Sequence, residues 1–252
     1  MSWLRRLGRR AGVVEQRRGP QAGFHLWWGP IALEPGEFIV ECAVTLRILE
    51  APSTPTLTFW ALQATFVDPA GASMGAAHLG LQWNPRHPDQ RAANWGGYRK
   101  THDVTSILDG TGSPLPSAPD DRNTRDYPWR VGAPYRLRIA RGGQGWAGWI
   151  TDIERDHAVL VRELHAGGDR LEHLVMWTEL FSDPDDPAFS ADWYEPRVVT
   201  STGRETGPDI VRVSYPPHEV WGRLDASAED GSVVQAVGVP RLTPPNAVLP
   251  IG

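Results

Sequence analysis

The sequence predicts an all-β fold, and more narrowly an antiparallel two-sheet jelly roll, a concanavalin- or lectin-like sandwich with a long loop excursion. Several segments alternate apolar and polar residues with a period of two, which is typical of half-buried strands. Turn-forming residues are abundant, with 26 glycines and 23 prolines among 252 residues. No interior segment has convincing helical periodicity, and about a dozen strands in one domain must close on themselves or stack as two sheets.

The clearest expected strand covers residues 38–49. Its apolar face runs through Cys42 to Ile48, and more mixed residues occupy the alternate positions. Residues 57–67 start apolar on both faces, as in a strand that is covered on both sides. A turn pattern at Asp68-Pro-Ala-Gly71 separates this segment from the next expected strand, residues 76–83.

The segment 84–132 has little periodicity and many glycines and prolines. A compact domain rarely keeps so long a stretch without structure. Either short strands lie within it, with residues 98–105 as a candidate, or it is a functional loop excursion. Strand patterns then return at a spacing of about ten residues, which suggests an antiparallel meander. These strands are expected at residues 135–139, 145–150, 158–161, 174–181, 197–200, 210–215, 219–224 and 233–239.

Three regions are expected along the chain. Residues 1–20 form a basic N-terminal tail or a short amphipathic helix, and residues 21–239 form a single β-sandwich domain. Residues 240–252 form a Pro-rich C-terminal tail or an edge wrap. A single domain fits the length, since all-β sandwiches can reach about 250 residues.

Charge is distributed unevenly. The first 20 residues hold six arginines and one acid, a net charge of +5, whereas the remainder holds 19 basic and 29 acidic residues, a net charge of −10. A body this acidic is not expected to bind nucleic acid, because phosphate contacts need clustered cations. Lys100 is the only lysine, and this arginine bias indicates a GC-rich bacterial coding sequence, such as that of an actinobacterium.

The basic N-terminal segment has apolar residues at helical spacing, with arginines on the other faces. An amphipathic helix of this kind could dock on a partner protein or an anionic membrane. The alternative is a disordered basic tail, since Gly8 and Gly12 each weaken a helix by about 1 kcal/mol. The predicted contact residues are Trp3, Leu4, Arg5, Arg6, Leu7, Arg9 and Arg10.

Cys42 is the only cysteine, so no intrachain disulfide and no cysteine-based metal cluster can form. Its position on the apolar face predicts a small buried thiol. The first ten residues have the charges of a signal peptide, but no apolar run of the required length follows them. There is also no 18-residue apolar stretch that would suit a membrane span. A cytoplasmic location is therefore expected.

Aromatic and amide side chains gather between residues 57 and 98. Two strand-like runs carry Gln63 and Gln82 near their ends, and a third piece places Asn94, Trp95 and Tyr98 around two glycines. Sugars present C–H faces that stack on aromatic rings, and hydroxyls that bond to amides and carboxylates. The hypothesis is a carbohydrate-binding surface; the alternative is that the rings pack in the core and the amides satisfy the backbone. The predicted ligand-binding residues are Gln63, Gln82, Trp83, Asn84, Asn94, Trp95, Tyr98 and Glu179.

Four short motifs carry a resemblance to a known family: Gly80-Leu-Gln82, Asn94-Trp-Gly-Gly-Tyr98, Trp146-Ala-Gly-Trp149 and Trp177-Thr-Glu179. Together they resemble a bacterial domain of unknown function, number 3472, over roughly residues 36 to 182. The resemblance implies a concanavalin-like sandwich of a kind often found beside sugar-binding modules. It supplies no catalytic residues.

A glycan-cleaving enzyme is a further alternative. Glycoside hydrolysis needs two carboxyl groups about 5 to 9 Å apart. Asp152 could pair with Glu154, or Glu179 could pair with an acid on a neighbouring strand. The sequence lacks the three carboxylates alternating along one strand that mark the hydrolases of this fold class. A non-catalytic protein is therefore the favoured hypothesis, and no catalytic residue is assigned.

No metal or other cofactor is expected. His157, His165 and His173 are spaced by eight, in no arrangement that is diagnostic of a metal site, and are expected to lie in solvent. No glycine-rich stretch follows a strand and opens a helix, so a nucleotide-binding loop has no support.

Overall fold

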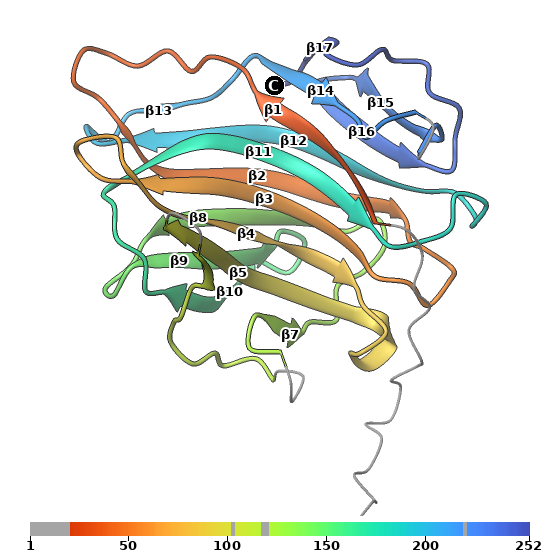
Figure 1. Ribbon diagram of the computed structural model, residues 1–252, viewed down its shortest axis with the longest axis horizontal. Helices are drawn as coiled ribbons and strands as arrows, with labels where there is room; N and C mark the ends of the chain where they lie inside the picture. The colour runs from red at the N-terminus through yellow and green to blue at the C-terminus, as the bar shows by residue number, and fades with distance from the viewer. Residues whose placement is uncertain (1–20, 102–103, 117–120, 219–220) are drawn as a thin grey trace, which may run out of the picture.

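The computed structural model describes residues 21–101, 104–116, 121–218 and 221–252, with the side chains of residues 100 and 101 left aside. It is an antiparallel all-β protein, as predicted, with one 3-10 turn at Pro88–Gln90 among the described residues (Figure 1). No helix in these ranges is long and apolar enough to cross a membrane.

The strands fall into two series, which we call the first and second sheets. Both belong to one hydrogen-bonded network, in which Leu171 lies opposite Ile39. The first sheet contains, in spatial order, β17 (Val248–Pro250), β14 (Ile210–Ser214), β1 (Ala22–Trp28), β11 (Arg170–Leu180), β3 (Thr58–Val67), β4 (Ser73–Trp83) and β5 (Arg91–Thr101), with β6 (Val104–Ile107) and β7 (Thr124–Asp126) both paired to β5.

The second sheet is built in the same way. It contains, in spatial order, β15 (Leu224–Glu229), β16 (Ser232–Val237), β12 (Phe189–Thr200), β2 (Ile39–Glu50), β8 (Pro134–Arg141), β9 (Trp146–Asp152) and β10 (His157–Leu164), with β13 (Glu205–Thr206) paired to the end of β12.

The main core lies between the two sheets. Phe66 of β3 stacks on Trp146 of β9 with 5.0 Å between ring centroids, and Trp60 meets Phe189 of β12 edge-on at 6.0 Å. Large rings of this kind dominate the area that a sandwich core buries. Cys42 is fully buried, as predicted from the alternation of its strand.

Strand β3 is apolar on both faces for two different reasons. Trp60 and Leu62 point into the main core. On the opposite face Phe59 and Ala61 form a second small cluster with Val175 and Trp177 of β11. The second face is thus covered by neighbouring side chains of the same sheet.

For residues 84–132 the structure supports the alternative with strands. They include the eleven-residue strand β5 as well as β6 and β7, so much of the expected loop excursion is sheet. The candidate strand at residues 98–105 falls on the end of β5 and the start of β6. The strand expected at residues 219–224 instead begins at Leu224, and residues 219–220 lie outside the described ranges. Strand β1 was not predicted. At the other end of the chain, Val248–Pro250 adds an edge strand beside β14, as an edge wrap would.

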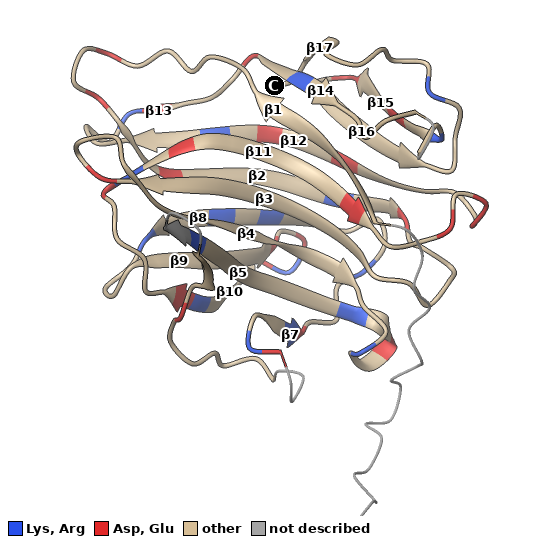
Figure 2. Cartoon of the chain, in the orientation of Figure 1, with Lys and Arg blue, Asp and Glu red and all other residues tan. Residues whose placement is uncertain are grey.

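Few charged side chains lie in the middle of the first sheet. Strands β1, β3 and β4 contain no Asp, Glu, Lys or Arg, whereas β11, between β1 and β3, carries Arg170 and Glu172 near one end and Glu179 near the other (Figure 2). The outer face of these strands is therefore sparsely charged in a protein of net charge −5.

Candidate functional site

The outer face of the first sheet carries a row of residues that crosses five strands. His25 of β1 lies opposite Trp177, Trp177 opposite Ala61, Ala61 opposite Gly80, and Gly80 opposite Asn94. Neighbouring strands are about 4.8 Å apart, so the row is about 19 Å long. Ala61 and Gly80 have little or no side chain, and the middle of the row is correspondingly low. We call this row and the side chains beside it the groove.

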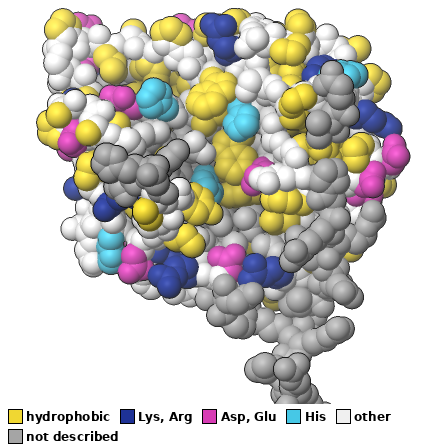
Figure 3. Space-filling view, viewed as in Figure 1, with side chains coloured by type: hydrophobic (Ala, Val, Ile, Leu, Met, Phe, Trp, Pro, Cys, Tyr) yellow, Lys and Arg dark blue, Asp and Glu magenta, His cyan; other side chains and the backbone are white. Residues whose placement is uncertain are grey.

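Two hollows lie in the groove. The central hollow has a volume of about 710 Å³ and is lined by residues that include His25, Gln63, His78, Trp177 and Glu179. Figure 3 shows hydrophobic side chains and histidines gathered in the middle of this face. The end hollow, of about 190 Å³, has a more polar lining. Most of it comes from β4, β5, the turn after β4 and residues 121–124, together with Leu57, Phe59, Glu179 and Phe181. The two hollows share His78, Tyr98, Glu179 and Phe181.

Aromatic rings form a connected set in the central hollow. Trp177 meets Phe59 edge-on with 5.0 Å between centroids, and His78 lies 5.6 Å from each of those rings. Tyr98 lies 6.1 Å from His78 and keeps 47% of its surface exposed. Packed rings beneath and an exposed ring at the side give a ligand flat apolar surfaces to contact.

The ionisable groups of the central hollow are shifted towards their neutral forms. Burial lowers the pKa of His78 to about 4 and also lowers the pKa of His25. Burial raises the pKa of Glu179, although a hydrogen bond from the Gln21 side chain opposes this shift. Desolvation disfavours the charged form of each group, so the hollow offers neutral imidazoles beside one carboxyl group.

The end hollow is rich in side-chain amides. Asn84 donates through Nδ2 to Gln82 Oε1 at 2.9 Å. The Oδ1 atoms of Asn94 and Asn123 are buried without a hydrogen-bond partner. A buried acceptor without a donor is costly. Both side chains belong to the lining of the end hollow, which is where their amides can meet a ligand.

His87 forms a buried array that no pattern in the sequence indicated. Its Nδ1 lies 2.7 Å from Asp126 Oδ1 and its Nε2 lies 3.0 Å from Thr124 Oγ1. Burial lowers the pKa of His87, against the opposing effect of Asp126. The His87 side chain is fully buried and Thr124 is 2% exposed, so a ligand cannot reach these groups. The array instead holds the turn that follows β4 against β7.

Six of the eight predicted ligand-binding residues line the two hollows: Gln63, Gln82, Asn84, Asn94, Tyr98 and Glu179. The other two predictions are wrong. Trp95 is fully buried between the sheets and donates to the carbonyl oxygen of Trp146. Trp83 donates to the carbonyl oxygen of Thr54 and packs on Trp129. Successive residues of a strand point to opposite faces, so Trp95 cannot share the outer face with Asn94, nor Trp83 with Gln82.

The prediction missed two residues that the alternation of the observed strands places on the outer face. His25 shares a face with Trp27 on β1, and His78 shares a face with Gln82 on β4. Phe59 and Trp177 were missed for another reason. Each lies in a segment whose two faces are both apolar, so periodicity could not tell which face is outer.

The other candidate chemistry is not brought together. Arg130 bonds to both Asp152 and Glu154, at 3.1 and 2.9 Å, so these two acids form an ion-pair cluster around an arginine. Within the described ranges, no three His, Cys, Asp or Glu side chains are grouped so that they could hold a metal ion. The contact residues predicted for the N-terminal segment, Trp3 to Arg10, lie outside those ranges.

No protein-family model and no curated protein matches the chain. Among solved structures, it is similar to a scytalido-glutamic peptidase in complex with a peptide-based transition-state analogue (9% identity, 86% of this chain and 97% of that chain, TM-score 0.45). It is similar to the CBM2 module of the evolved Dit of Lactobacillus casei BL23 phage J-1 (12% identity, 71% of each chain, TM-score 0.41). It is also similar to bacteriophage CBA120 tailspike protein 2 (14% identity, 79% of this chain and 25% of that chain, TM-score 0.34).

Proposed function

We propose that the protein binds a neutral glycan, without cleaving it, in the groove on the outer face of its first sheet. The observation that carries the proposal is the composition of the groove floor. Aromatic rings and side-chain amides face a hollow of about 710 Å³ whose lining includes a single acid, Glu179, on strands that have no Asp, Glu, Lys or Arg apart from those of β11.

The chemistry of the lining suits a sugar in two respects. The C–H face of a pyranose can stack on the exposed ring of Tyr98, while Gln63 and Glu179 can exchange hydrogen bonds with its hydroxyls. His25 and His78 are in their neutral forms and therefore offer a charged ligand no ion pair. A neutral polyhydroxylated ligand therefore matches the groove better than a phosphate or a peptide with many charges.

Titration of intrinsic tryptophan fluorescence with soluble oligosaccharides tests the proposal. Trp177 is one of the residues that line the hollow, so a bound sugar should alter its fluorescence emission. Tyr98→Ala should weaken binding about fivefold, since an aromatic contact contributes about 1 kcal/mol. The matched control is Tyr194→Ala on the second sheet. Absence of any saturable response, or equal binding by the wild type and Tyr98→Ala, would contradict the proposal.

The structure lends less support to a glycan-cleaving enzyme. Two acids line the groove, Glu179 and Asp121. Asp121 bonds to the backbone N–H groups of Asn123 and Thr124 and forms an ion pair with Arg86. An acid held in this way is poorly placed to activate a water molecule.

A second candidate function is carried by the charge of the N-terminal segment, which has six arginines in 20 residues. We propose it as a docking segment for an acidic protein or an anionic membrane, in a protein located in the cytoplasm. Deleting residues 1–20 should then abolish sedimentation with phosphatidylserine vesicles while glycan binding persists. Equal sedimentation with and without the segment would contradict this role.

A further inference from the structure

The groove is closed at its β5 end. Strand β7 extends the sheet beyond β5, and Thr124 lies opposite Asn94. The outer face of β7 is covered, because the fully buried His87 bonds to the side chains of both Thr124 and Asp126. The turn that carries His87, residues 84–90, therefore stands on the sheet where the row of groove residues ends.

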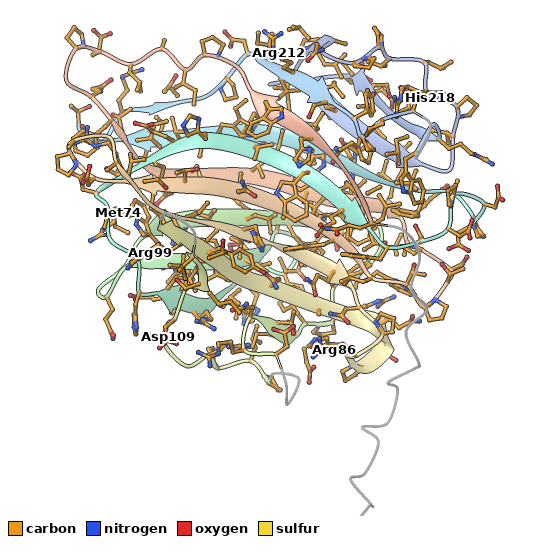
Figure 4. The ribbon with its side chains drawn as sticks, in the orientation of Figure 1. Met74, Arg86, Arg99, Asp109, Arg212 and His218 are labelled. Atoms are coloured by element: carbon orange, nitrogen blue, oxygen red, sulfur yellow. The ribbon has the colours of Figure 1, made fainter. Side chains whose placement is uncertain are left out.

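Further contacts hold this wall in place. Arg86 of the same turn forms an ion pair with Asp121, at 3.4 Å, across the end hollow. Figure 4 places Arg86 at the end of β5 that is remote from Arg99 and Met74. Asp121 in turn accepts hydrogen bonds from the backbone of Asn123 and Thr124. The turn after β4 and the segment before β7 are thus joined to each other above the floor.

The side chain of Asn123 lies directly on the floor. A Cβ at Gly96 would be 2.5 Å from Asn123 Cγ, so Asn123 takes this position only because residue 96 has no side chain. Its Oδ1 and that of Asn94 are the two acceptors without partners. Both residues line the end hollow, and Asn94 is 7% exposed.

We infer that the groove takes the end of a glycan chain, with the terminal sugar in the end hollow. The inference deepens the proposed function and rests on it. Two neighbouring hydroxyls of the terminal ring bond to the side-chain amides of Asn94 and Asn123, and the ring packs against Phe59, since all three side chains line this hollow. The preceding sugars lie in the central hollow beside Tyr98 and Trp177. The wall formed by residues 84–90 leaves no path for the chain to continue past β5.

Chain length provides the test. Tryptophan fluorescence of the full-length protein is titrated with linear tetrasaccharides and with soluble linear polymers of about 100 units, in matched glucose, mannose, xylose and galactose series. Each molecule has one such end, so half-saturation by the polymer should require about 25 times the mass concentration that the tetrasaccharide requires. Half-saturation at the same mass concentration would overturn the inference while the proposed function stood. No saturable response to any sugar would overturn the proposed function itself.

A substitution tests the role of the amides. Asn94→Ala should weaken tetrasaccharide binding about tenfold, because the hydrogen bond between the sugar and the Asn94 side-chain amide is lost. The fold should tolerate the change, since Asn94 Oδ1 has no partner in the protein. Gln144→Ala, which removes an exposed amide in the hairpin between β8 and β9, is the matched control. Unchanged binding by a folded Asn94→Ala protein would overturn the assignment of the terminal sugar to the end hollow.

Discussion

Lowering the pH from 7 to 5 should destabilise the protein through His78. Its ring lies among Phe59, Trp177 and Tyr98 on the outer face of the first sheet. Burial lowers its pKa from 6.5 to about 4, because a charged imidazole is poorly solvated there. The unfolded chain binds this proton more readily than the folded one. The stability that the neutral ring confers is therefore complete above pH 6.5 and is lost as the pH falls towards 4.

The magnitude follows from the two pKa values. Between pH 7 and pH 5 the linkage relation gives a loss of about 2 kcal/mol from His78 alone. This loss of about 2 kcal/mol is an upper limit, because the His78 side chain is partly exposed and water there stabilises the charged ring. Since His25 also has a lowered pKa, the wild-type protein should lose somewhat more in total.

Urea denaturation at pH 7 and pH 5 measures the effect. The contribution of His78 is the loss of unfolding free energy in the wild type minus the loss in His78→Gln, whose side chain does not titrate. His157→Gln, at an exposed histidine, is the control and should lose as much stability as the wild type. If His78→Gln and the wild type lost equal stability between the two pH values, the ring would be solvated well enough to hold a proton, and the reasoning would be wrong.

Three further substitutions have distinct expected outcomes. Glu179→Gln should raise the thermal midpoint at pH 7 and have little effect at pH 4, because the raised pKa of Glu179 shows that its charged form is disfavoured in the folded state; an equal shift at both pH values would exclude this cause. Trp95→Ala should cost about 3–5 kcal/mol in urea denaturation, as for a large ring removed from a core; a loss below 1 kcal/mol would place Trp95 outside the core. Gly80→Ala should lower the thermal midpoint by several degrees, since a Cβ there would lie 1.8 Å from the Trp60 carbonyl oxygen; an unchanged midpoint would show that the β3–β4 pair can separate without cost.

The sequence was most informative where a strand has one buried face. Strand β2 alternates clearly, and its fully buried Cys42 follows from that pattern. Strand β5 was not recognised as a full strand because Ala92, Asn94 and the Gly96-Gly97 pair are weak strand formers, and pairing with β4 and β7 overrides that preference. Local propensity therefore failed at the strand that forms the end of the groove.

The candidate site was found in outline from residue type and only partly from position. Rings and amides indicated the correct segments, but treating Trp95 and Asn94 as one surface ignored the alternation of the strand. The wall depends on contacts between residues far apart in the chain, such as His87 with Asp126 and Arg86 with Asp121. Neither pair lies in a repeating pattern, so no periodicity could have indicated it.

The single thiol of the chain can report how often the sandwich opens. Cys42 lies at the centre of the second sheet, paired with Ile139 on one side and Val198 on the other, and burial raises the pKa of its thiol. A thiol in this state reacts only after β2 has separated from its neighbours. The rate of labelling by an aromatic disulfide reagent under native conditions would thus report how often the central strand becomes accessible, without any introduced probe.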